Sequence, residues 1–416
     1  MRERQTRREW LLKGASVAAA GYVAQSSLLR AARAIAAPVA ITRCKTYDAA
    51  ELVPKLKRLF DLLGGLGRIV KGRTVAVKIN MTGAPGYRLR YLPLGDTHYT
   101  HPNMIAATLH LMERAGARRI RVLESPWSST GPVEESLLLA NIQPRNILNA
   151  ATNVEFENTN YLGRGKRYSR LMVPFGGLLF PGYDLNHSYE DCDVFVSLTK
   201  MKEHETTGFT LSMKNCFGIT PCSIYGLGGG DEPNEEPKGG RGLLHGGNRQ
   251  PPKSALPEKD PRTPRQAGYR VPRAVVDLIA TRPVDLAIID GIKTMSGGEG
   301  PWAPEPMSAV HPGVLLAGSN PVNTDAVGLS VMGFDPMADR GTFPFLTSDN
   351  MLRLAEDAGL GTRDLKRIEV VGTPVNEARF DFAALSKPAA RLRFAGSGSG
   401  CLVSRAHPVL HYDLAG

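Results

Sequence analysis

Cysteine is scarce in this chain, with five residues in 416, and none of the five forms a C-x2-C pair. That spacing is typical of iron–sulfur and zinc sites, so its absence argues against an iron–sulfur electron carrier. Aromatic residues are also few, at 7%. Residues 1–36 carry +5 of the net charge of +11, and the remaining +6 is dispersed, without the dense basic stripe and interleaved aromatics of a nucleic-acid binder. We therefore expect no nucleic-acid partner.

Long hydrophobic runs and nucleotide-binding fingerprints are missing as well. The weakly apolar stretch Ala15–Ala24 is too short to span a bilayer. Neither G-x-G-x-x-G nor G-x-x-x-x-G-K-[ST] occurs, so we predict no nucleotide site of those kinds. The apolar content of 42% and the charged content of 22% are ordinary for a globular protein that buries a sizeable core.

The N-terminal segment has the features of a targeting sequence. Residues Thr6–Lys13 (TRREWLLK) resemble the twin-arginine export motif, and a small-residue cleavage site near Ala34–Ala37 follows the short apolar stretch. We predict that residues 1–36 are a twin-arginine signal peptide. The export machinery is then a partner, the folded protein reaches the periplasm or another extracytoplasmic compartment, and no membrane span remains after cleavage. An uncleaved anchor or a basic helix is the alternative.

Strand and helix patterns alternate along most of the remaining chain. Buried strands are expected at Thr74–Asn80, Arg119–Glu124 and Asp193–Leu198, with a helix at His101–Ala115 between the first two. This rhythm predicts one three-layer α/β domain over residues 37–388, with a mainly parallel sheet and helices on both faces. Residues 389–416 would form a C-terminal tail.

Two segments depart from the rhythm. Val154–Phe180 is less regular and predicts an antiparallel excursion. Residues 226–268 are rich in Gly and Pro and contain His245. A long insert of this composition is usually a flap over a site or a disordered surface loop, and the composition does not decide between the two.

The densest group of polar residues lies in Val194–Pro221. A buried strand leads into Lys200, Lys202 and His204 at every second position, and an expected helix at Gly208–Phe217 then carries Lys214 and Asn215. Ligands bind where parallel strands end in α/β sheets. Lysine binds carboxylate or phosphate, and histidine moves protons near neutral pH. A solvated loop and a simple helix C-cap are the alternatives.

Three more strand ends carry polar residues. Lys78 and Asn80 are two apart and therefore share one face of their strand. Glu124 ends the next strand. Asp290 ends a later apolar strand and precedes a Gly-rich turn that contains Glu299. Since carboxyl ends of parallel strands meet at one edge of a sheet, we expect these residues to line a single cleft.

Several motifs occur in the order of a known family. They are VAVKINM, HPNMIAATLHLMERAG, the central Val194–Pro221 segment, VDLAIIDGIKTMSGGEGPW and LLAGSNPVNTDAVGLSVMGFDP. Together, from about Thr74 to about Gly372, they resemble the domain-of-unknown-function 362 (DUF362) family. The resemblance implies no agreed activity. Some relatives carry ferredoxin-like iron–sulfur motifs that this chain lacks, and relatives tend to carry histidine at the position of His245.

These observations assign an expected role to each candidate residue. The function that they predict is an enzyme acting on a small anionic compound. The alternatives are a non-catalytic periplasmic protein that binds a ligand or cofactor and, less favoured, an iron–sulfur redox accessory protein. The sequence identifies no cofactor, although these residues could hold a divalent metal, and it contains no iron–sulfur cluster motif. Catalytic roles are expected for His204, Lys214 and Glu299, substrate binding for Lys78, Asn80, Lys200, Lys202, Asn215 and His245, and metal binding for His101, Glu124 and Asp290.

Overall fold

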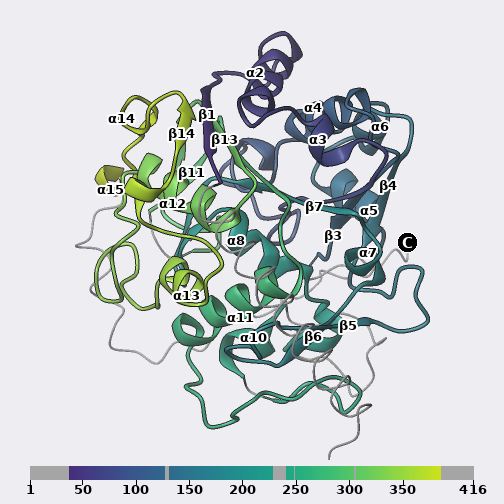
Figure 1. The fold of residues 1–416 in the computed structure, drawn as a ribbon, viewed down its shortest axis with the longest axis vertical. Helices are drawn as coiled ribbons and strands as arrows, with labels where there is room; N and C mark the ends of the chain where they lie inside the picture. Colours follow the sequence, from purple (N-terminus) through teal and green to yellow (C-terminus); the bar gives the residue numbers. More distant parts are fainter. Residues whose placement is uncertain (1–36, 127–130, 228–239, 248, 304–305, 386–416) are drawn as a thin grey trace, which may run out of the picture.

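The computed structural model describes residues 37–126, 131–227, 240–247, 249–303 and 306–385. The expected signal peptide (1–36) and the expected tail (389–416) lie outside these residues. An eight-stranded sheet in the order β14-β1-β13-β10-β7-β2-β3-β4 forms the centre of the molecule (Figure 1). Its strands are β1 Val39–Arg43, β2 Thr74–Lys78, β3 Arg119–Glu124, β4 Val154–Asn158, β7 Val194–Lys200, β10 Leu286–Gly291, β13 Val314–Gly318 and β14 Val370–Gly372.

The sheet is mainly parallel, as predicted. Strands β4, β3, β2, β7 and β10 all run the same way, and only β13 is antiparallel to both of its neighbours. The strands β2, β7 and β10 are buried along their full length, as expected for strands covered on both faces. In the register between β7 and β10, Lys200 lies opposite Asp290. The carboxyl ends of five strands therefore meet at one edge.

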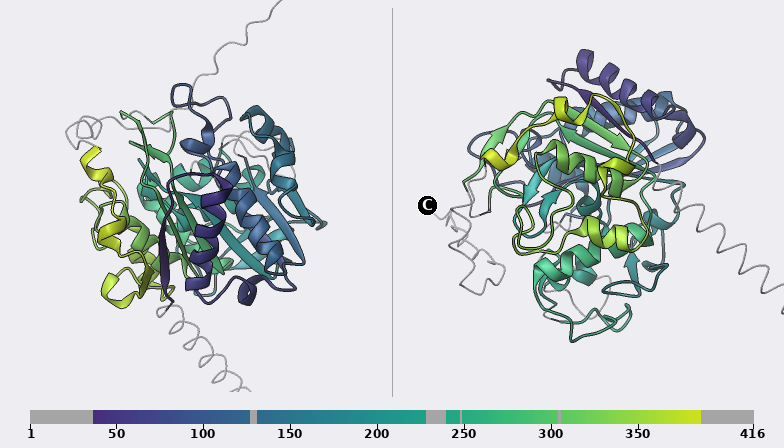
Figure 2. Two further views of the ribbon diagram at one scale, coloured as in Figure 1. Left: turned by 90° about the horizontal axis from the view of Figure 1, so that it is seen from above. Right: turned by 60° about the vertical axis from the view of Figure 1, so that its left-hand side comes forward.

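Helices cover both faces of the sheet, and each face has its own hydrophobic core (Figure 2). This arrangement confirms the three-layer prediction. Helix α4 begins with Pro102 at its first turn and with the His101 side chain accepting from the backbone N–H of Asn103. One face carries α2 Ala49–Leu62, α3 Gly67–Val70, α4 Pro102–Arg114, α5 Val133–Leu139 and α6 Pro144–Leu148. The other carries α8 Ser212–Asn215, α11 Ala267–Thr281, α12 Pro321–Val331 and α13 Met351–Asp357.

Shorter elements connect these layers. No helix in the described ranges is long and apolar enough to cross a membrane.

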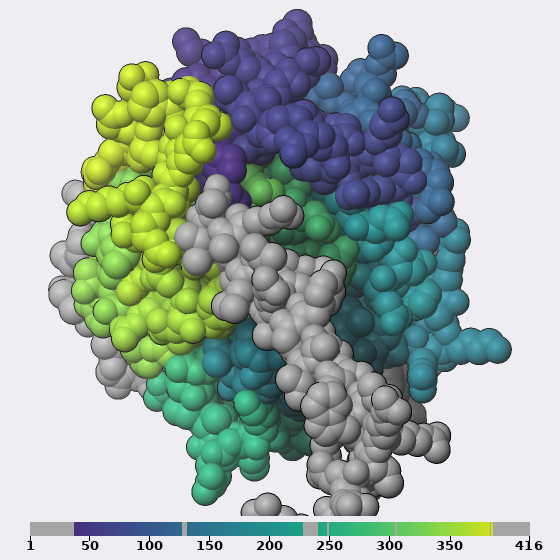
Figure 3. All heavy atoms as spheres, viewed as in Figure 1, coloured from purple at the N-terminus to yellow at the C-terminus, as the bar shows by residue number. Residues whose placement is uncertain are grey.

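Early residues and the last described residues lie together at one end of the molecule (Figure 3), where β1 pairs with β14. The shorter elements are η1 Leu94–Asp96, α7 His187–Glu190, α9 Cys222–Tyr225, α10 Gly242–Gly246, β11 Thr294–Ser296, β12 Ser308–Val310, η3 Leu365–Arg367, α14 Val375–Ala378 and α15 Phe382–Leu385.

Two local predictions need correction. The segment expected to be an antiparallel excursion supplies β4 to the main parallel sheet, and only β5 (Ser169–Met172) pairs antiparallel, with β6 (Gly182–Leu185). The helix expected at Gly208–Phe217 is shorter. Its first residues form β9 (Gly208–Thr210), which pairs with β8 (Lys202–His204). Gly208 has a φ of +84°, which a helix does not allow.

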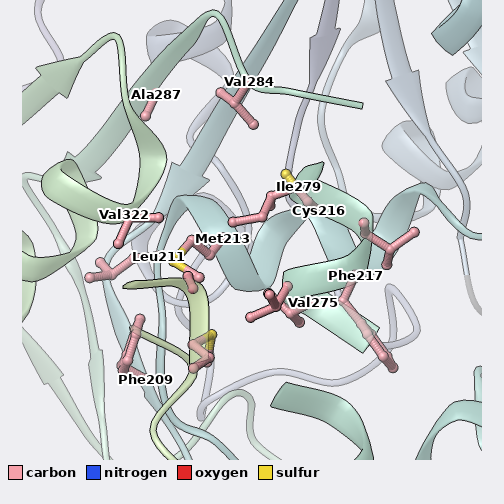
Figure 4. Packing of buried hydrophobic residues seen from close by; sticks show 14 of the residues in the cluster. Phe209, Leu211, Met213, Cys216, Phe217, Val275, Ile279, Val284, Ala287 and Val322 are labelled. Atoms are coloured by element: carbon pink, nitrogen blue, oxygen red, sulfur yellow. The ribbon is translucent and has the colours of Figure 1, made fainter. Parts of the chain in front are cut away.

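The short helix α8 rests on a hydrophobic core. Met213 of α8, together with Cys216 and Phe217 of the following η2 turn (Cys216–Ile219), packs close to Val275 and Ile279 of α11 (Figure 4). Asp325 of α12 accepts the backbone N–H groups of Ser212 and Met213 at 2.8 and 2.7 Å. The start of α8 is thus held from two sides, which fixes the backbone that presents Lys214.

Candidate functional site

Four charged residues end four adjacent strands of the sheet. Lys200 and Asp290 come from β7 and β10, and Lys78 and Glu124 from β2 and β3. All four are buried, with at most 4% of each residue exposed. Buried charges must be paired, because an isolated one carries a large desolvation penalty. The sheet edge therefore holds two internal ion pairs.

The first pair joins β2 to β3. The ammonium of Lys78 lies 2.9 Å from Oε1 of Glu124. Asn215, which we expect to bind substrate, also bridges two strands: its Nδ2 donates to the Lys78 carbonyl at 3.2 Å and to Ser197 Oγ at 3.0 Å. Its Oδ1 accepts from Asn80 at 3.3 Å. These residues form a buried polar framework beneath the end of α8.

The second pair joins β7 to β10. The ammonium of Lys200 lies 2.7 Å from Oδ2 of Asp290, and the Tyr47 hydroxyl donates to Oδ1 at 2.7 Å. The ring of His101 stacks on Tyr47 with centroids 3.5 Å apart. Burial and the nearby charges of Lys200 and Lys293 lower the pKa of His101 to about 3, so its imidazole is neutral.

The three residues expected to share a metal do not form such a site. Glu124 and Asp290 each neutralise a buried lysine, and His101 lies against Tyr47. Within the described ranges, no three His, Cys, Asp or Glu side chains form a group that could hold a metal ion. The donor arrangement does not fit a divalent metal at these residues, and the metal expectation has no structural support.

The β8–β9 hairpin positions Lys202 and His204. Lys202 pairs with Thr210 across the hairpin, and His204 lies two residues along, so all three side chains share one face. The ammonium of Lys202 donates to the carbonyls of His98 and Glu299 at 3.0 and 2.8 Å. Burial lowers the pKa of Lys202 to about 7, although the nearby Glu299 charge opposes this.

Glu299 lies against this hairpin. Its Oε2 is 2.6 Å from Nε2 of His204, and its Oε1 accepts from the indole N–H of Trp302 at 3.2 Å. Burial alone would raise the pKa of Glu299, but His204, Lys214 and Lys202 outweigh burial and hold this pKa well below its usual value. Glu299 is therefore an oriented carboxylate at neutral pH.

Lys214 differs from the other lysines of the site because it is partly exposed. Its ammonium lies over the ring of Phe217, 4.3 Å from the centroid. In the part of the chain that the structure describes, it has no carboxylate partner and no hydrogen bond. Burial lowers the pKa of Lys214 to about 8 despite the nearby Glu299 charge. Lys214 is thus a cation that is free to meet a ligand.

The described part of the Gly/Pro-rich insert is anchored to the site rather than loose. Arg241 donates to the carbonyls of Ser125 and Gly218, both at 3.0 Å. Helix α10 packs on α11, and His245 of α10 places its ring edge against Phe217, with centroids 5.2 Å apart. His245 therefore lies on the same aromatic ring as Lys214.

Some buried polar atoms of the site lack a partner among the described residues. They include Asn80 Oδ1, His98 Nε2 and Thr210 Oγ1, and also His204 Nε2, whose close contact with Glu299 lacks hydrogen-bond geometry. Buried polar atoms are nearly always hydrogen-bonded, so such a group at one edge of the sheet is typical of a place where water or a ligand belongs.

Two hollows in the surface of the described residues lie away from this cluster. One of about 460 Å³ lies at the amino ends of β2 to β4 and is lined by paired arginines such as Arg119. Another, of about 170 Å³, reaches His101. Neither includes Lys214 or Glu299, so the candidate site rests on its chemistry: a free cation, an oriented carboxylate and unpaired buried atoms.

The structure thus brings together some of the expected residues and adds others. Lys202, His204, Lys214, His245 and Glu299 form one group, which we call the Lys214 cluster. Lys78, Asn80, Lys200 and Asn215 lie beneath it in the framework of the sheet edge. Three residues near the site were not predicted by motif spacing: Tyr47, Arg241 and Trp302.

Comparison with known proteins gives a family and a few relatives. A family model described as Domain of unknown function (DUF362) matches residues 75–330. The curated Thylakoid-associated protein sll1697 of Synechocystis sp. is 31% identical over 188 residues, covering 44% of this chain and 50% of that protein. The chain thus spans about half the length of the curated relative that it matches.

Two solved structures show limited similarity. A crystal structure of a protein from Thermotoga maritima is 16% identical, with a TM-score of 0.28, and the match covers 62% of this chain and 54% of the other. The lactate racemase apoprotein of Thermoanaerobacterium thermosaccharolyticum is 10% identical, with a TM-score of 0.30, over 67% of this chain and 54% of the other.

Proposed function

The chain belongs to the DUF362 family, whose description assigns no activity, and we propose that it is an exported enzyme that acts on a small anionic compound, a carboxylate or a phosphate. The observation that carries the proposal is Lys214. Its ammonium is partly exposed, lies over an aromatic ring, and has no carboxylate partner among the described residues. A compact ammonium of this kind binds carboxylate or phosphate as a point charge.

The surrounding charges favour an anion at this position. Arg241 and Lys78 lie near enough to lower the pKa of Lys214, while Glu299 and Glu205 oppose them. The guanidinium of Arg241 donates only to carbonyl and hydroxyl oxygens, so its charge is not neutralised by a carboxylate among the described residues. A bound anion would relieve the repulsion between these cations.

The Glu299–His204 pair supports chemistry rather than binding alone. A carboxylate that accepts from the Trp302 indole and lies 2.6 Å from an imidazole is a preorganised negative charge beside a free cation. Such a pair stabilises positive charge that develops during a proton transfer. A protein that only stores a ligand would need the cations but would gain nothing from this oriented carboxylate.

Export by the twin-arginine route is part of the proposal. It rests on the TRREWLLK motif and on the cleavage site that follows it. The motif lies in residues 1–36, outside the described ranges, so the fold neither supports nor opposes it.

Anion binding is tested by isothermal titration of the mature protein with sulfate, phosphate and acetate. Substitution K214M keeps an apolar chain over Phe217 but removes the charge. We expect affinity to fall at least about tenfold, because a hydrogen bond to a charged group contributes about 1.5–3 kcal/mol. The control K57M removes an exposed lysine of α2. Equal affinity in K214M and K57M would contradict the proposal.

Turnover is tested separately. A panel of small carboxylates and phosphates is incubated with the protein in D2O, and proton NMR follows exchange of carbon-bound protons with solvent. Exchange of at least one compound, lost in K214M, is expected of the enzyme. Binding without exchange across the panel would instead favour the non-catalytic ligand-binding protein.

A further inference from the structure

Three histidines lie near Lys214, and their ring nitrogens are not equivalent. A neutral imidazole has one N–H donor and one lone pair, and the partner of one nitrogen fixes the role of the other. The partners of His204, His98 and His245 therefore indicate which of them has a nitrogen lone pair available to a ligand.

His204 makes a regular hydrogen bond at Nδ1 only, and its Nε2 lies in a close contact with a carboxylate. Its Nδ1 accepts the backbone N–H of Thr206 at 3.1 Å, so the lone pair is used and the proton lies on Nε2. That nitrogen faces Oε2 of Glu299 at 2.6 Å. The residue is also nearly inaccessible, with 3% exposed. His204 therefore orients Glu299 and has no free lone pair with which to accept a proton.

His98 is shielded from any ligand that approaches from solvent. It is fully buried, its Nδ1 lies 3.0 Å from Thr97 Oγ1, and its ring packs edge-on to Trp302. Its Nε2 has no partner among the described residues. Because no part of His98 is exposed, a ligand from solvent cannot reach this atom without a rearrangement of the surrounding side chains.

His245 presents the opposite arrangement. Its Nδ1 lies 2.9 Å from the carbonyl oxygen of Arg241. A carbonyl can only accept, so Nδ1 carries the proton and Nε2 carries the lone pair. The residue is partly exposed, like Lys214, and both rest on the ring of Phe217.

We propose that Nε2 of His245 is the atom that accepts a proton from the anion held at Lys214. The inference rests on the proposed function of Lys214. In this step an X–H bond of the bound compound breaks and an Nε2–H bond forms. The electron pair stays on X, whose developing negative charge faces the Lys214 ammonium. The imidazolium keeps its Nδ1–H bond to the Arg241 carbonyl.

The surrounding charges suit this role. Burial and the Lys214 charge lower the pKa of His245 to about 4, so the imidazole is neutral at physiological pH and its lone pair is available. An anion bound at Lys214 would cancel part of that repulsion and raise this pKa towards the range of an effective base. Glu299 acts in the same direction and would stabilise the imidazolium.

The backbone around His245 is held firmly enough to position it. Arg241, one helical turn before it, is bound to the ends of β3 and η2 through Ser125 and Gly218. From the other side, Arg270 of α11 donates to the Leu243 carbonyl at 3.2 Å. Arg241 is therefore a positioning residue: it accepts the Nδ1–H of His245 and anchors α10 over the sheet edge.

The free nitrogen is tested by chemical modification of the folded mature protein. Diethyl pyrocarbonate acylates accessible, unprotonated imidazole nitrogens, and mass spectrometry locates the product. We expect His245 to react at least about tenfold faster than His98 and His204, because only its nitrogen is both free and accessible. Exposed His110 and His311 serve as internal references. An unreactive His245 beside reacting references would overturn the inference.

Sulfate separates this inference from the proposed function. Sulfate at Lys214 should slow the modification of His245 in the wild type and should have no such effect in K214M. If His245 reacts but sulfate does not slow its modification, anion binding at Lys214 is contradicted. If sulfate does protect His245 but His245 reacts more slowly than His204, only the assignment of His245 as the base is contradicted.

The proton transfer itself is tested with H245N. The asparagine amide can still donate to the Arg241 carbonyl, so α10 keeps its anchor, but no atom replaces Nε2. For the panel compound that exchanges fastest in D2O, we expect the exchange rate to fall at least about a hundredfold while affinity changes less than about twofold. An unchanged exchange rate in H245N would overturn the inference.

Discussion

Lys78 and Glu124 form an ion pair across neighbouring parallel strands, with Nζ 2.9 Å from Oε1 and both side chains shielded from water. The backbone N–H groups of Met81 and Ser125 also donate to the Glu124 carboxylate, at 2.8 and 2.9 Å. Burial lowers the pKa of Lys78, while the charge of Glu124 opposes that shift. The pair is therefore part of the framework under the Lys214 cluster rather than a ligand contact.

Loss of Glu124 should destabilise the fold. In E124Q the Lys78 ammonium would stay buried without a counter-charge, which costs about 3–5 kcal/mol. We expect the free energy of unfolding in urea to fall by that amount. The double variant K78M/E124L, which replaces the pair with apolar side chains, should recover most of the loss. A change below about 1 kcal/mol in E124Q would show that the pair is not buried.

Anion affinity should depend on pH through Lys214. Sulfate keeps its charge between pH 6 and 10, so its binding reports only the protein. Since the pKa of Lys214 is lowered to about 8, the ammonium loses its proton above that value, and affinity should fall about tenfold per pH unit. Because the pKa of Lys202 is about 7, loss of its proton should add a smaller decline in affinity that begins near pH 7. In K214M the decline above pH 8 should disappear, and a wild type without that decline would refute the assignment.

Gly83 leaves room for Trp302. A Cβ atom on Gly83 would lie 2.2 Å from the indole, and its φ of +82° is a strained value for other residues. G83A should therefore displace Trp302 from Glu299, shift the tryptophan emission and destabilise the protein by about 1–3 kcal/mol. A Cβ atom on Gly86 would have no neighbouring atom within 4 Å, so G86A is the matched control. Identical spectra and stabilities for the two variants would argue against the Trp302–Glu299 contact.

Export should require the paired arginines. Replacement of Arg7 and Arg8 by lysine should keep the protein in the cytoplasm, because the export machinery reads the arginine pair rather than its charge. Cell fractionation with immunodetection measures the outcome. The control replaces Arg30 and Arg33 by lysine and should still be exported. Normal export of the Arg7/Arg8 variant would mean that residues 1–36 are not a twin-arginine signal.

The edge of the sheet could be predicted because strand ends carry a clear signal. Lys78 and Asp290 each follow a run of buried, mainly apolar residues, Glu124 and Lys200 end strands that are buried over most of their length, and parallel strands end at one edge. Which lysine meets which carboxylate could not be predicted. That depends on strand order, and β7 lies between β2 and β10, far from both in sequence.

The contacts made by loop residues near the site were harder to predict from the sequence. The spacing of Lys202 and His204 left open whether this stretch is extended or helical; in the structure it is the strand β8, and both side chains share one face. Arg241 and Trp302 lie in Gly-rich stretches without periodicity, so no pattern indicates that they contact Ser125 and Glu299. The spacing of Arg241 and His245, four residues apart, was the one available signal, because residues four apart share a face of a helix.

The central claim, that the Lys214 cluster binds a small anion, is tested most directly by diffraction from crystals of the mature protein soaked in selenate. Selenium scatters anomalously, so the bound anion is located without any assumption about the substrate. We predict an anomalous peak within hydrogen-bonding distance of the Lys214 ammonium, beside His245 and Glu299. Peaks confined to surface arginines such as Arg118 and Arg119, with none at Lys214, would contradict the account.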